Sequence, residues 1–498
     1  MPEPERKQES QSLTHFYLYL EKDGRPVEAE APLMRAVLSI TVENSLHLPD
    51  VATLEIYDPQ LKWVDSDKLT PGRAIRITAR ATEKNSEEKP VFEGEIVEIE
   101  SEFGTGSHQL IVRVFDRLHR LTRGRHVRSF RNVTDADVVK RLAAEARLET
   151  DVTATRRVHR HLFQNNQTNL EFLRERAKAL GFLLYVSGKK LCFKPPSDHK
   201  EREIELHWGG NLHEFRARMT TIGQVNKVIV RGWDPQSRRE ITGQSDKGES
   251  ARKIGEKKQG GAMAKEAFQI QAEHLVANQP VRSQAEADHI AKAVADRQAE
   301  RFIEADGECR GNPGIIAGAT IKLFGLGERF SGNYFVTAAT HHYSAERNYN
   351  THFHISGQTP ATLLRLLRGD EDERAMNGFG LIVGIVTDNS DPDGWGRVKV
   401  KFPYLTGDYA TDWARVVSAG AGRQRGIQFI PEVNDEVLVG FEFGDVHHPY
   451  VIGSLWNGKD SPPDKQGAGK IVIADKYGNS IKLDSEGVTI KGKTINLN

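Results

Sequence analysis

Apolar and polar residues alternate along most of the first hundred residues, which is the spacing of strands with one buried face. The clearest runs are Ala36–Ser45, Ala52–Asp58 and Ala74–Ala81. Val91–Phe103 and His108–Asp116 alternate in the same way on either side of Gly104-Thr105-Gly106, so they predict a hairpin with a glycine-containing turn. Because one face of each strand can be buried, this segment predicts a small barrel.

Two stretches then change to the spacing of amphipathic helices. Thr134–Ala146 begins with a threonine that can cap a helix, and Asp135 and Asp137 lie in the first turn, where the helix dipole favours acidic side chains. Asn169–Leu180 is followed by Gly181 at the position of a C-cap. The sequence therefore predicts that helices interrupt the strands.

A second β-rich segment follows the helices. Its strands are predicted at Gln224–Pro235, Thr320–Gly325, Asn333–Ser344 and Asn350–Gly357, with a helix at Ser283–Arg301. Ser237–Lys265 is polar and rich in Gly and Lys, so it is predicted to be a loop. Both segments combine strands with helix, which leaves an internal duplication open.

The pattern changes again near the C-terminus. From Gly380 to Trp456, about five short strand-like runs separated by turns predict a small Greek-key barrel of the OB type. Lys470–Asn498 alternates β-branched and polar residues between tight turns at 477–479 and 485–487. A single ribbon of this kind cannot bury its apolar side, so it predicts self-association into a β-prism.

Composition narrows the classes of function. The 498-residue chain has 69 Lys and Arg against 69 Asp and Glu, whereas proteins that neutralise many phosphates carry a basic excess. Cys192 and Cys309 stand outside any metal-binding spacing and predict buried free thiols, which fits assembly in a reducing cytoplasm. The polar N-terminal residues do not read as a signal peptide, and no stretch reaches the ~20 apolar residues of a membrane span.

The motifs predict no catalytic, cofactor or metal site. His341-His342, His352, His354 and His447-His448 are the best metal candidates, but no partner stands at a recognisable spacing, so surface or interface positions are the favoured interpretation. Asp388–Gly394 resembles part of a calcium loop but lacks its terminal glutamate, which favours a turn. No zinc-protease, serine-hydrolase or P-loop motif is present.

The order of the motifs carries a specific resemblance. GLIVGIVTDNSDPDGWGRVKVKFPYL (380–405), DWARVVSAGAG (412–422), FIPEVNDEVLVGFEFGD (429–445) and HHPYVIGSLWNGKDSPP (447–463) resemble the OB domain of VgrG spikes and of related phage-tail spikes. VRGWDP (230–235) and GATIKLFGLGERFSGNYFVTAATHHYS (318–344) resemble the phage late control protein D family. The chain is thus identified as a VgrG-like spike protein of a contractile injection system, with an extracellular or phage-like system favoured over type VI secretion.

The resemblance implies a mainly β fold with helical inserts (α+β). It consists of two tube-like β-barrels in a hub, an OB-fold barrel, and a short intertwined triple-stranded β-prism. The expected domains are a flexible tail (1–12), the hub (13–370), a linker (371–379), the OB domain (380–457), a second linker (458–469) and the prism (470–498).

The implied function is structural, not enzymatic, and needs no cofactor. Three copies are expected to join a hexameric Hcp-like inner tube to a PAAR-repeat tip protein, to contact baseplate proteins, and to puncture the target envelope; effector cargo is a further partner that the family allows. Ile495, Leu497 and Asn498 end the ribbon and are the predicted tip-protein contacts. The protein is expected to assemble in the cytoplasm and then to join the injection particle.

An OB-fold protein that binds nucleic acid or glycan is the alternative interpretation. Trp395, Phe402, Tyr404 and Trp413 would then stack on the ligand, although core filling is the commoner role of such residues. A peptidoglycan hydrolase fused to a spike is a third class, which turnover of cell-wall material would identify.

Overall fold

The computed structural model describes residues 14–22, 24–46, 48–81, 87–105, 107–195, 204–234, 237, 239–248, 253–254, 256–277, 281–346, 348–355, 380–402, 410–445, 447–464 and 468–496. The chain divides into two compact units, residues 1–374 and residues 375–498. None of the helices within the described ranges has the length and apolar composition that crossing a membrane requires.

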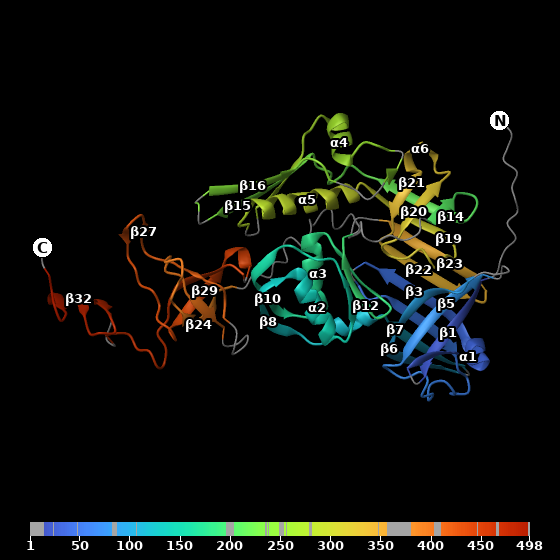
Figure 1. Ribbon diagram of the computed structural model, residues 1–498, viewed down its shortest axis with the longest axis horizontal. Coiled ribbons are helices and arrows are strands. Elements are labelled where there is room, and N and C mark those ends of the chain that lie inside the picture. The colour runs from blue at the N-terminus through green and yellow to red at the C-terminus, as the bar shows by residue number, and fades with distance from the viewer. Residues whose placement is uncertain are drawn as a thin grey trace. The chain divides into compact units, whose positions relative to one another are not determined.

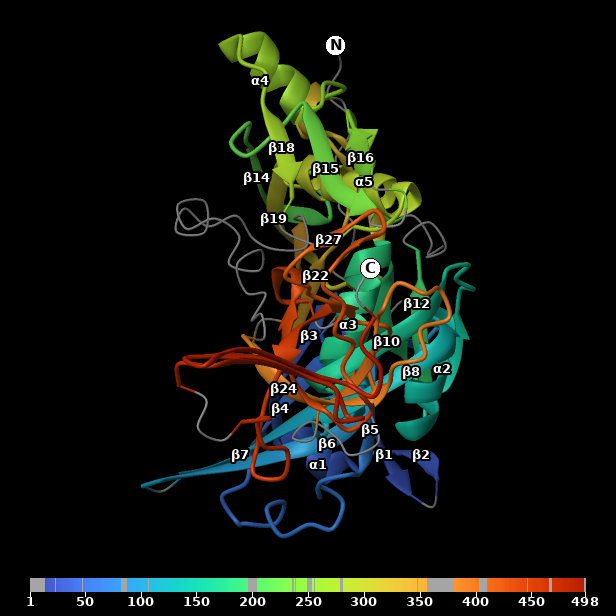
Figure 2. The same cartoon turned by 90° about the vertical axis from the view of Figure 1, so that its left-hand side faces the viewer.

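Eleven strands of the first unit form one antiparallel sheet (Figure 1). In spatial order they are β14 (Leu212–Met219), β19 (Ile303–Arg310), β23 (Asn348–Ile355), β22 (Ala338–Ser344), β3 (Val37–Ser45), β4 (Val51–Tyr57), β7 (Ser107–Phe115), β6 (Lys89–Gly104), β5 (Ala74–Ala81), β1 (Thr14–Lys22) and β2 (Arg25–Glu28). The pairing of β3 with β22 joins early strands to late ones and sets Thr41 opposite His342. Figure 2 shows the long β6–β7 hairpin reaching past the other strands of the sheet.

Two hydrophobic cores lie along this sheet. The first is built on β1 to β7 and includes Leu18, Ile40, Leu54, Ile77 and Val112. The second is built on β14, β19, β22 and β23 and is completed by a smaller sheet. The strands of that smaller sheet are β13 (Ile204–His207), β20 (Thr320–Phe324), β21 (Gly332–Phe335) and β17 (Lys253–Ile254). Two cores therefore stand where the resemblance implies two β-barrels.

A helical insert with its own core follows β7. The 3-10 helix η1 (Arg117–Thr122) leads into α2 (Asp135–Glu145) and α3 (Asn169–Leu180), which pack with two small sheets. Those sheets consist of β8 (His126–Thr134) with β10 (Val158–Gln167), and of β11 (Leu183–Ser187), β12 (Lys190–Lys194) and β9 (Glu149–Val152). Thr134 caps α2 in a reciprocal pair with Asp137, and Gly181 ends α3 in the left-handed conformation, which confirms both predicted helices and their ends.

The expectation of a loop at Ser237–Lys265 is wrong. This range contains β16 (Arg239–Ser245), β17 and part of α4 (Gly260–Phe268). β16 pairs with β15 (Lys227–Asp234), β15 pairs with β18 (Glu273–Val276), and α5 (Gln284–Glu300) covers the resulting sheet (Figure 1). Gly243 serves this packing and not a turn, because a Cβ atom there would lie 2.3 Å from the backbone carbonyl carbon of Ala287 on α5.

The second unit contains a five-stranded sheet, a short hairpin and a three-stranded ribbon. The sheet has the order β25 (Lys399–Lys401), β24 (Ile382–Asp388), β29 (Glu436–Phe441), β30 (Pro449–Ser454) and β26 (Arg415–Val416). β27 (Ala421–Gly422) and β28 (Arg425–Gly426) form a hairpin, and β31 (Ile471–Ala474), β32 (Ser480–Asp484) and β33 (Gly487–Lys491) form the C-terminal ribbon. The 3-10 turn η3 (Glu442–Gly444) follows β29, and short helices α1 (Ala31–Ala36) and α6 (Gly327–Phe330) belong to the first unit.

The predicted fold class, mainly β with helical inserts, is confirmed by these elements. Cys192 and Cys309 are buried free thiols, as predicted. The predicted domain boundaries remain predictions.

Candidate assembly interface

The C-terminal ribbon presents six aliphatic side chains on one face. Its register pairs Ile473 with Ile481 and Ile481 with Ile490, and it pairs Ile471 with Leu483 and Leu483 with Val488. Because alternate residues of a strand share a face, these two rows of three lie on the same side of the sheet. The opposite side carries polar residues such as Lys482, Thr489 and Lys491.

This apolar face is uncovered within the chain. The six side chains are between 38% and 65% exposed. Burying a half-exposed aliphatic side chain contributes ~1 kcal/mol, so covering all six is worth on the order of 6 kcal/mol per chain. The ribbon is therefore a surface that gains stability when a partner covers it.

The turns of the ribbon are fixed by local hydrogen bonds. The Asp475 carboxylate accepts from the backbone N–H groups of Tyr477 (2.9 Å) and Asn479 (2.8 Å). Lys476 in the same turn forms an ion pair with Glu432 at 2.9 Å, which ties the turn to the segment before β29. The apolar rows are thus set in register before any partner binds.

The three predicted tip contacts are only partly described by the structure. Ile495 lies beyond β33 and is half exposed. Leu497 and Asn498 lie outside the described residues. Their assignment to a tip interface remains a prediction.

The structure describes three of the four aromatic residues that the nucleic-acid interpretation names. Phe402 is buried in the core, and Tyr404 lies outside the described residues. Trp395 and Trp413 are accessible, but Arg397 lies over both rings, at 5.0 Å and 6.0 Å from their centroids. Phe402 therefore fills the core, and the two tryptophans contact a cation of their own barrel.

The calcium-like stretch is a turn built around Asp391. Its carboxylate accepts from the backbone N–H groups of Trp395 (2.8 Å) and Arg397 (3.1 Å) and from the Arg397 guanidinium. The hydrogen bonds from Arg397 outweigh desolvation and hold the pKa of Asp391 well below its usual range. Asp391 therefore anchors a turn, as the sequence predicts.

The histidines do not form a metal centre within the part of the chain that the structure describes. His352 and His354 each face a carboxylate across the sheet, Glu308 at 3.6 Å and Asp306 at 2.6 Å. His447 and His448 both lie against Asp445.

The surface interpretation is wrong for His341. Its ring is buried, its Nδ1 lies 2.8 Å from the Tyr349 hydroxyl, and burial lowers its pKa to about 4. Alternate residues of β22 point inward: Ala339 belongs to the second core and Tyr343 packs against the first. His341 occupies the inward position between them, whereas His342 lies on the outer face.

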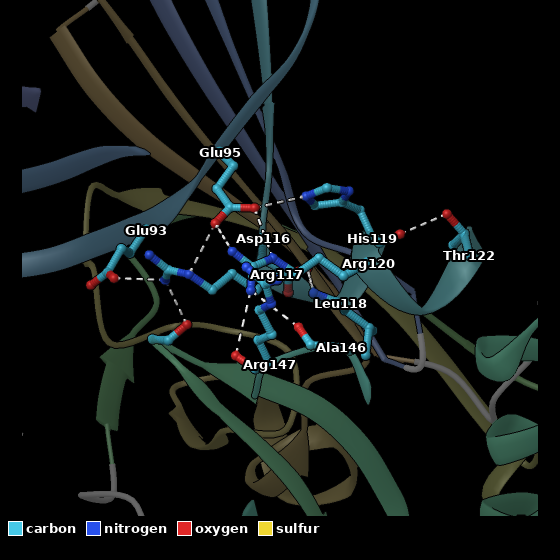
Figure 3. Close-up of polar contacts among 11 residues, drawn as sticks. Glu93, Glu95, Asp116, Arg117, Leu118, His119, Arg120, Thr122, Ala146 and Arg147 are labelled. Carbon is cyan, nitrogen blue, oxygen red and sulfur yellow. Dashed lines mark hydrogen bonds and ion pairs between the residues drawn. The ribbon is translucent and has the colours of Figure 1, made fainter. Parts of the chain in front are cut away.

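A buried ion cluster joins the long sheet to the helical insert (Figure 3). Glu95 on β6 lies 3.1 Å from Nε2 of His119, 3.0 Å from Nε of Arg120 and 3.3 Å from Nε of Arg117. Burial alone would raise the pKa of Glu95, but the hydrogen bonds from His119 and Arg120 outweigh it and lower the pKa to about 2.

The two arginines of this cluster also donate hydrogen bonds to the backbone of the insert. Arg117 donates to the carbonyl oxygen of Gly188 at 2.9 Å, and Arg120 donates to that of Ala146 at 3.1 Å. The cluster therefore connects β6 to the end of α2 and to the β11–β12 turn. No local sequence signal marks this cluster, because its members are separated along the chain and charged residues are frequent everywhere.

Most of the chain matches one known protein family. Residues 22–345, well over half of the chain, match the family described as the Alg8 N-terminal domain. The chain belongs to this family. Residues 382–456 of the same Alg8-family chain match the type VI secretion system/phage-baseplate injector OB domain.

Curated relatives of the Alg8-family chain are spike proteins. The type VI secretion system spike protein VgrG2a of Pseudomonas aeruginosa is 35% identical over 86 residues, which are 16% of this chain and 10% of the relative. VgrG1b of the same organism is 32% identical over 108 residues, 21% of this chain and 14% of the relative. VgrG3 of Vibrio cholerae is 36% identical over 75 residues, 14% of this chain and 7% of the relative. The matches confirm the VgrG resemblance, but they span only a small part of those proteins' length.

Solved structures share the fold at low identity. An E. coli component of the type VI secretion system, described as structurally similar to T4 bacteriophage tail proteins gp27 and gp5, aligns with a TM-score of 0.54 and 14% identity, over 88% of this chain and 99% of that one. VgrG in a Francisella PdpA–VgrG complex aligns with a TM-score of 0.53 and 9% identity, over 97% of this chain and 88% of that one. A 43 kDa prophage tail protein from Shewanella oneidensis aligns with a TM-score of 0.51 and 12% identity, over 69% of this chain and 98% of that one. The Alg8-family chain thus has the fold of phage-tail and VgrG proteins.

Proposed function

We propose that three copies of the chain form the spike at the tip of the inner tube of a contractile injection system. The observation that carries this proposal is the apolar face of the ribbon, whose two rows of three aliphatic side chains are uncovered within one chain. Identical neighbours are the simplest cover, because their ribbons offer the same apolar face, so that the three faces can enclose a common core. The relatives named as spike proteins and the shared tail-protein fold support the same role.

The proposed partners follow from the VgrG resemblance. The two cores on the long sheet would give three copies six tube-like modules, which suits a hexameric Hcp-like tube ring. A PAAR-repeat protein would bind the ribbon end near Ile495, baseplate proteins would contact the hub, and effector cargo is a further partner. Assembly would take place in the cytoplasm, with an extracellular or phage-like particle as the destination.

The role proposed is mechanical and not enzymatic. A spike that leads the tube must pass a compressive load from one part of the chain to the next without unfolding. The Glu95 cluster supports this role, since it ties the long sheet to the insert through buried ion pairs and backbone hydrogen bonds.

The oligomeric state tests the proposal directly. Analytical ultracentrifugation of the purified full chain at micromolar concentration should give a single species of three times the chain mass. A folded monomer under these conditions would reject the trimer. A second measurement tests the tip: deletion of Gly487–Asn498 should abolish binding of a PAAR-repeat protein while the circular dichroism of the first unit is retained, and undiminished binding would reject the tip assignment.

A further inference from the structure

The OB barrel carries a projecting arm that meets the barrel at Val417, whose backbone N–H donates to the carbonyl oxygen of Val451 on β30 at 2.8 Å. The arm is defined as Val417–Phe429, which contains the β27–β28 hairpin and stands away from β24 and β29 (Figure 1). Every residue of the arm except Gly420 is exposed, including the aliphatic and aromatic side chains of Val417 (54%), Ile427 (51%) and Phe429 (63%). Apolar side chains at this exposure on a projecting hairpin mark a surface that binds something else.

The arm is ordered by its own hydrogen bonds. The backbone N–H of Ile427 donates to the carbonyl oxygen of Gly420 at 3.1 Å, and the Ser418 hydroxyl lies within hydrogen-bonding distance of the carbonyl oxygens of both residues. Gly426 has a φ of 147°, and a Cβ atom there would lie 2.2 Å from the carbonyl oxygen of Gly420, so only glycine fits. A preformed arm binds without a large ordering cost.

The same barrel carries an uncovered apolar surface, the seat, on the outward side of β24, β29 and β30. Leu381 and Ile452 flank Gly440: a Cβ atom on Gly440 would lie 3.3 Å from Cδ2 of Leu381 and 3.1 Å from Cδ1 of Ile452. Leu381 is 60% exposed and Ile452 is 43% exposed. Val383 and Leu438, which pair across the strands, continue this face, while the alternate residues fill the core. Gly440 itself is buried, so the side chains of Leu381 and Ile452 cover it and form the exposed centre of the seat.

The charges of the arm and of the seat are complementary. Arg423 and Arg425 lie at the tip of the arm, and the structure records no ion pair for either among the residues it describes. The seat has Glu436 at one end of β29 and Glu442 just beyond the other. The arginines of the arm and the two glutamates of the seat therefore carry opposite charges, and both surfaces are also apolar.

We propose that the arm of one copy docks on the seat of a second copy of this chain, with Ile427 and Phe429 against Leu381 and Ile452. Arm and seat are different surfaces, so the contact is heterologous, and such contacts close into a ring when each copy turns by a third of a circle. The inference rests on the proposed trimer and deepens it, because it assigns the contact between neighbouring OB barrels. It also predicts which side chains of the two copies lie together.

Disulfide trapping in the full-length protein tests this pairing. Cys192 and Cys309 are buried, so they should not take part in disulfides between new surface cysteines. Copies with Phe429→Cys and copies with Ile452→Cys are co-expressed and mildly oxidised. We expect disulfide-linked dimers in the mixture, products of up to three chains in the double variant, and at least tenfold less product from either single variant alone.

The outcomes separate the two proposals. Trimers in the ultracentrifuge without this cross-link would overturn the arm contact and leave the trimer intact. Efficient self-linking of Phe429→Cys alone would also overturn it, because arm would then meet arm. Monomers would instead reject the trimer itself.

A charge exchange provides a second test that does not depend on cysteine geometry. Arg423→Glu with Arg425→Glu should lower the cross-linking yield about tenfold, the scale of interfacial charge pairs. Adding Glu436→Lys with Glu442→Lys should restore most of the yield if the two surfaces meet. Failure of the restoring pair would overturn the proposed contact.

Discussion

The ring of Phe16 on β1 stacks on the ring of Tyr343 on β22, with centroids 4.6 Å apart and planes inclined by 23°. Five strands separate β1 from β22 in the order of the sheet. The two rings can meet only if the sheet curls until its distant strands face each other. Tyr349 on β23 meets the same Phe16 ring edge-on at 4.8 Å, so three aromatic rings close the first core.

Truncating Phe16 should therefore weaken the closure of the first unit. Phe16→Ala removes a buried ring that packs on two others, and it should lower the free energy of unfolding by ~3–5 kcal/mol. Denaturant unfolding followed by near-ultraviolet circular dichroism measures this change. Phe268→Ala, at a 62% exposed phenylalanine at the end of α4, is the control and should shift the midpoint little.

The Glu95 cluster predicts a loss of stability in acid. The pKa of Glu95 is lowered from 4.5 to about 2, so its ion pairs stabilise the folded state fully above pH ~4.5, and this contribution is lost as pH falls towards 2. The full contribution is ~3 kcal/mol. Glu95→Gln should flatten the decline of unfolding free energy between pH 5 and pH 2.5 and should lower stability at pH 7, because Arg117 then lies buried without this carboxylate.

Glu98→Gln is the matched control for Glu95. Glu98 lies on the same strand and pairs with Arg113, but its side chain is 53% exposed. Solvent screens such a pair, so the change should cost less than ~1 kcal/mol. Equal losses from both variants would contradict a special role for the buried cluster.

The buried carboxyl groups of Asp50 and Asp116 predict that stability has the opposite dependence on pH. Burial raises the pKa of Asp50 to about 6, and burial together with the charge of Asp50 raises the pKa of Asp116. A raised carboxyl pKa means that the folded state holds its proton more tightly, so the pair destabilises the fold progressively as pH rises from ~4 to above ~6. Asp116→Asn keeps an oxygen for the N–H of Leu118 and removes one charge.

The variant should therefore gain thermal stability relative to the parent at pH 8 and lose this advantage near pH 4. Thermal midpoints measured across this range check the prediction, and a constant difference between variant and parent would refute it.

The two sides of the ribbon predict opposite outcomes for one substitution. Ile490→Lys places a charge in an apolar row and should dissociate the trimer in sedimentation experiments. Thr489→Lys, one residue earlier, adds the same charge to the polar side and should leave the trimer intact. If both variants remain trimeric, the apolar face is not the contact.

Local signals were sufficient for much of this fold. A few neighbouring residues are enough to predict the helix cap at Thr134, the helix end at Gly181 and the alternating strands. The predicted helices and the β6–β7 hairpin are present. The loop expected at Ser237–Lys265 failed because Gly243 has a packing role that only α5 reveals. Sequence periodicity also could not show that β3 pairs with β22, since that pairing depends on contacts across most of the first unit.

The candidate interfaces were predicted to different degrees. The alternation of apolar and polar residues is enough to predict the apolar face of the ribbon, because every second residue of a strand lies on the same side. The seat on the OB barrel gives no such signal, since its outward Leu381 and Ile452 resemble core residues of the same strands. The Glu95 cluster was equally hidden, because acidic and basic residues make up 28% of the chain.

The pairing of β3 with β22 also has a consequence for biosynthesis. Thr41 and the His342 that it contacts are separated by 301 positions in the chain. At a translation rate of ~5–20 residues per second, one edge of β3 waits about 15–60 seconds for its neighbour to emerge from the ribosome. During that interval the nascent chain exposes an open strand edge. Premature pairing of this edge with another copy would lower the yield of folded protein, and chaperones that cover the edge would raise it.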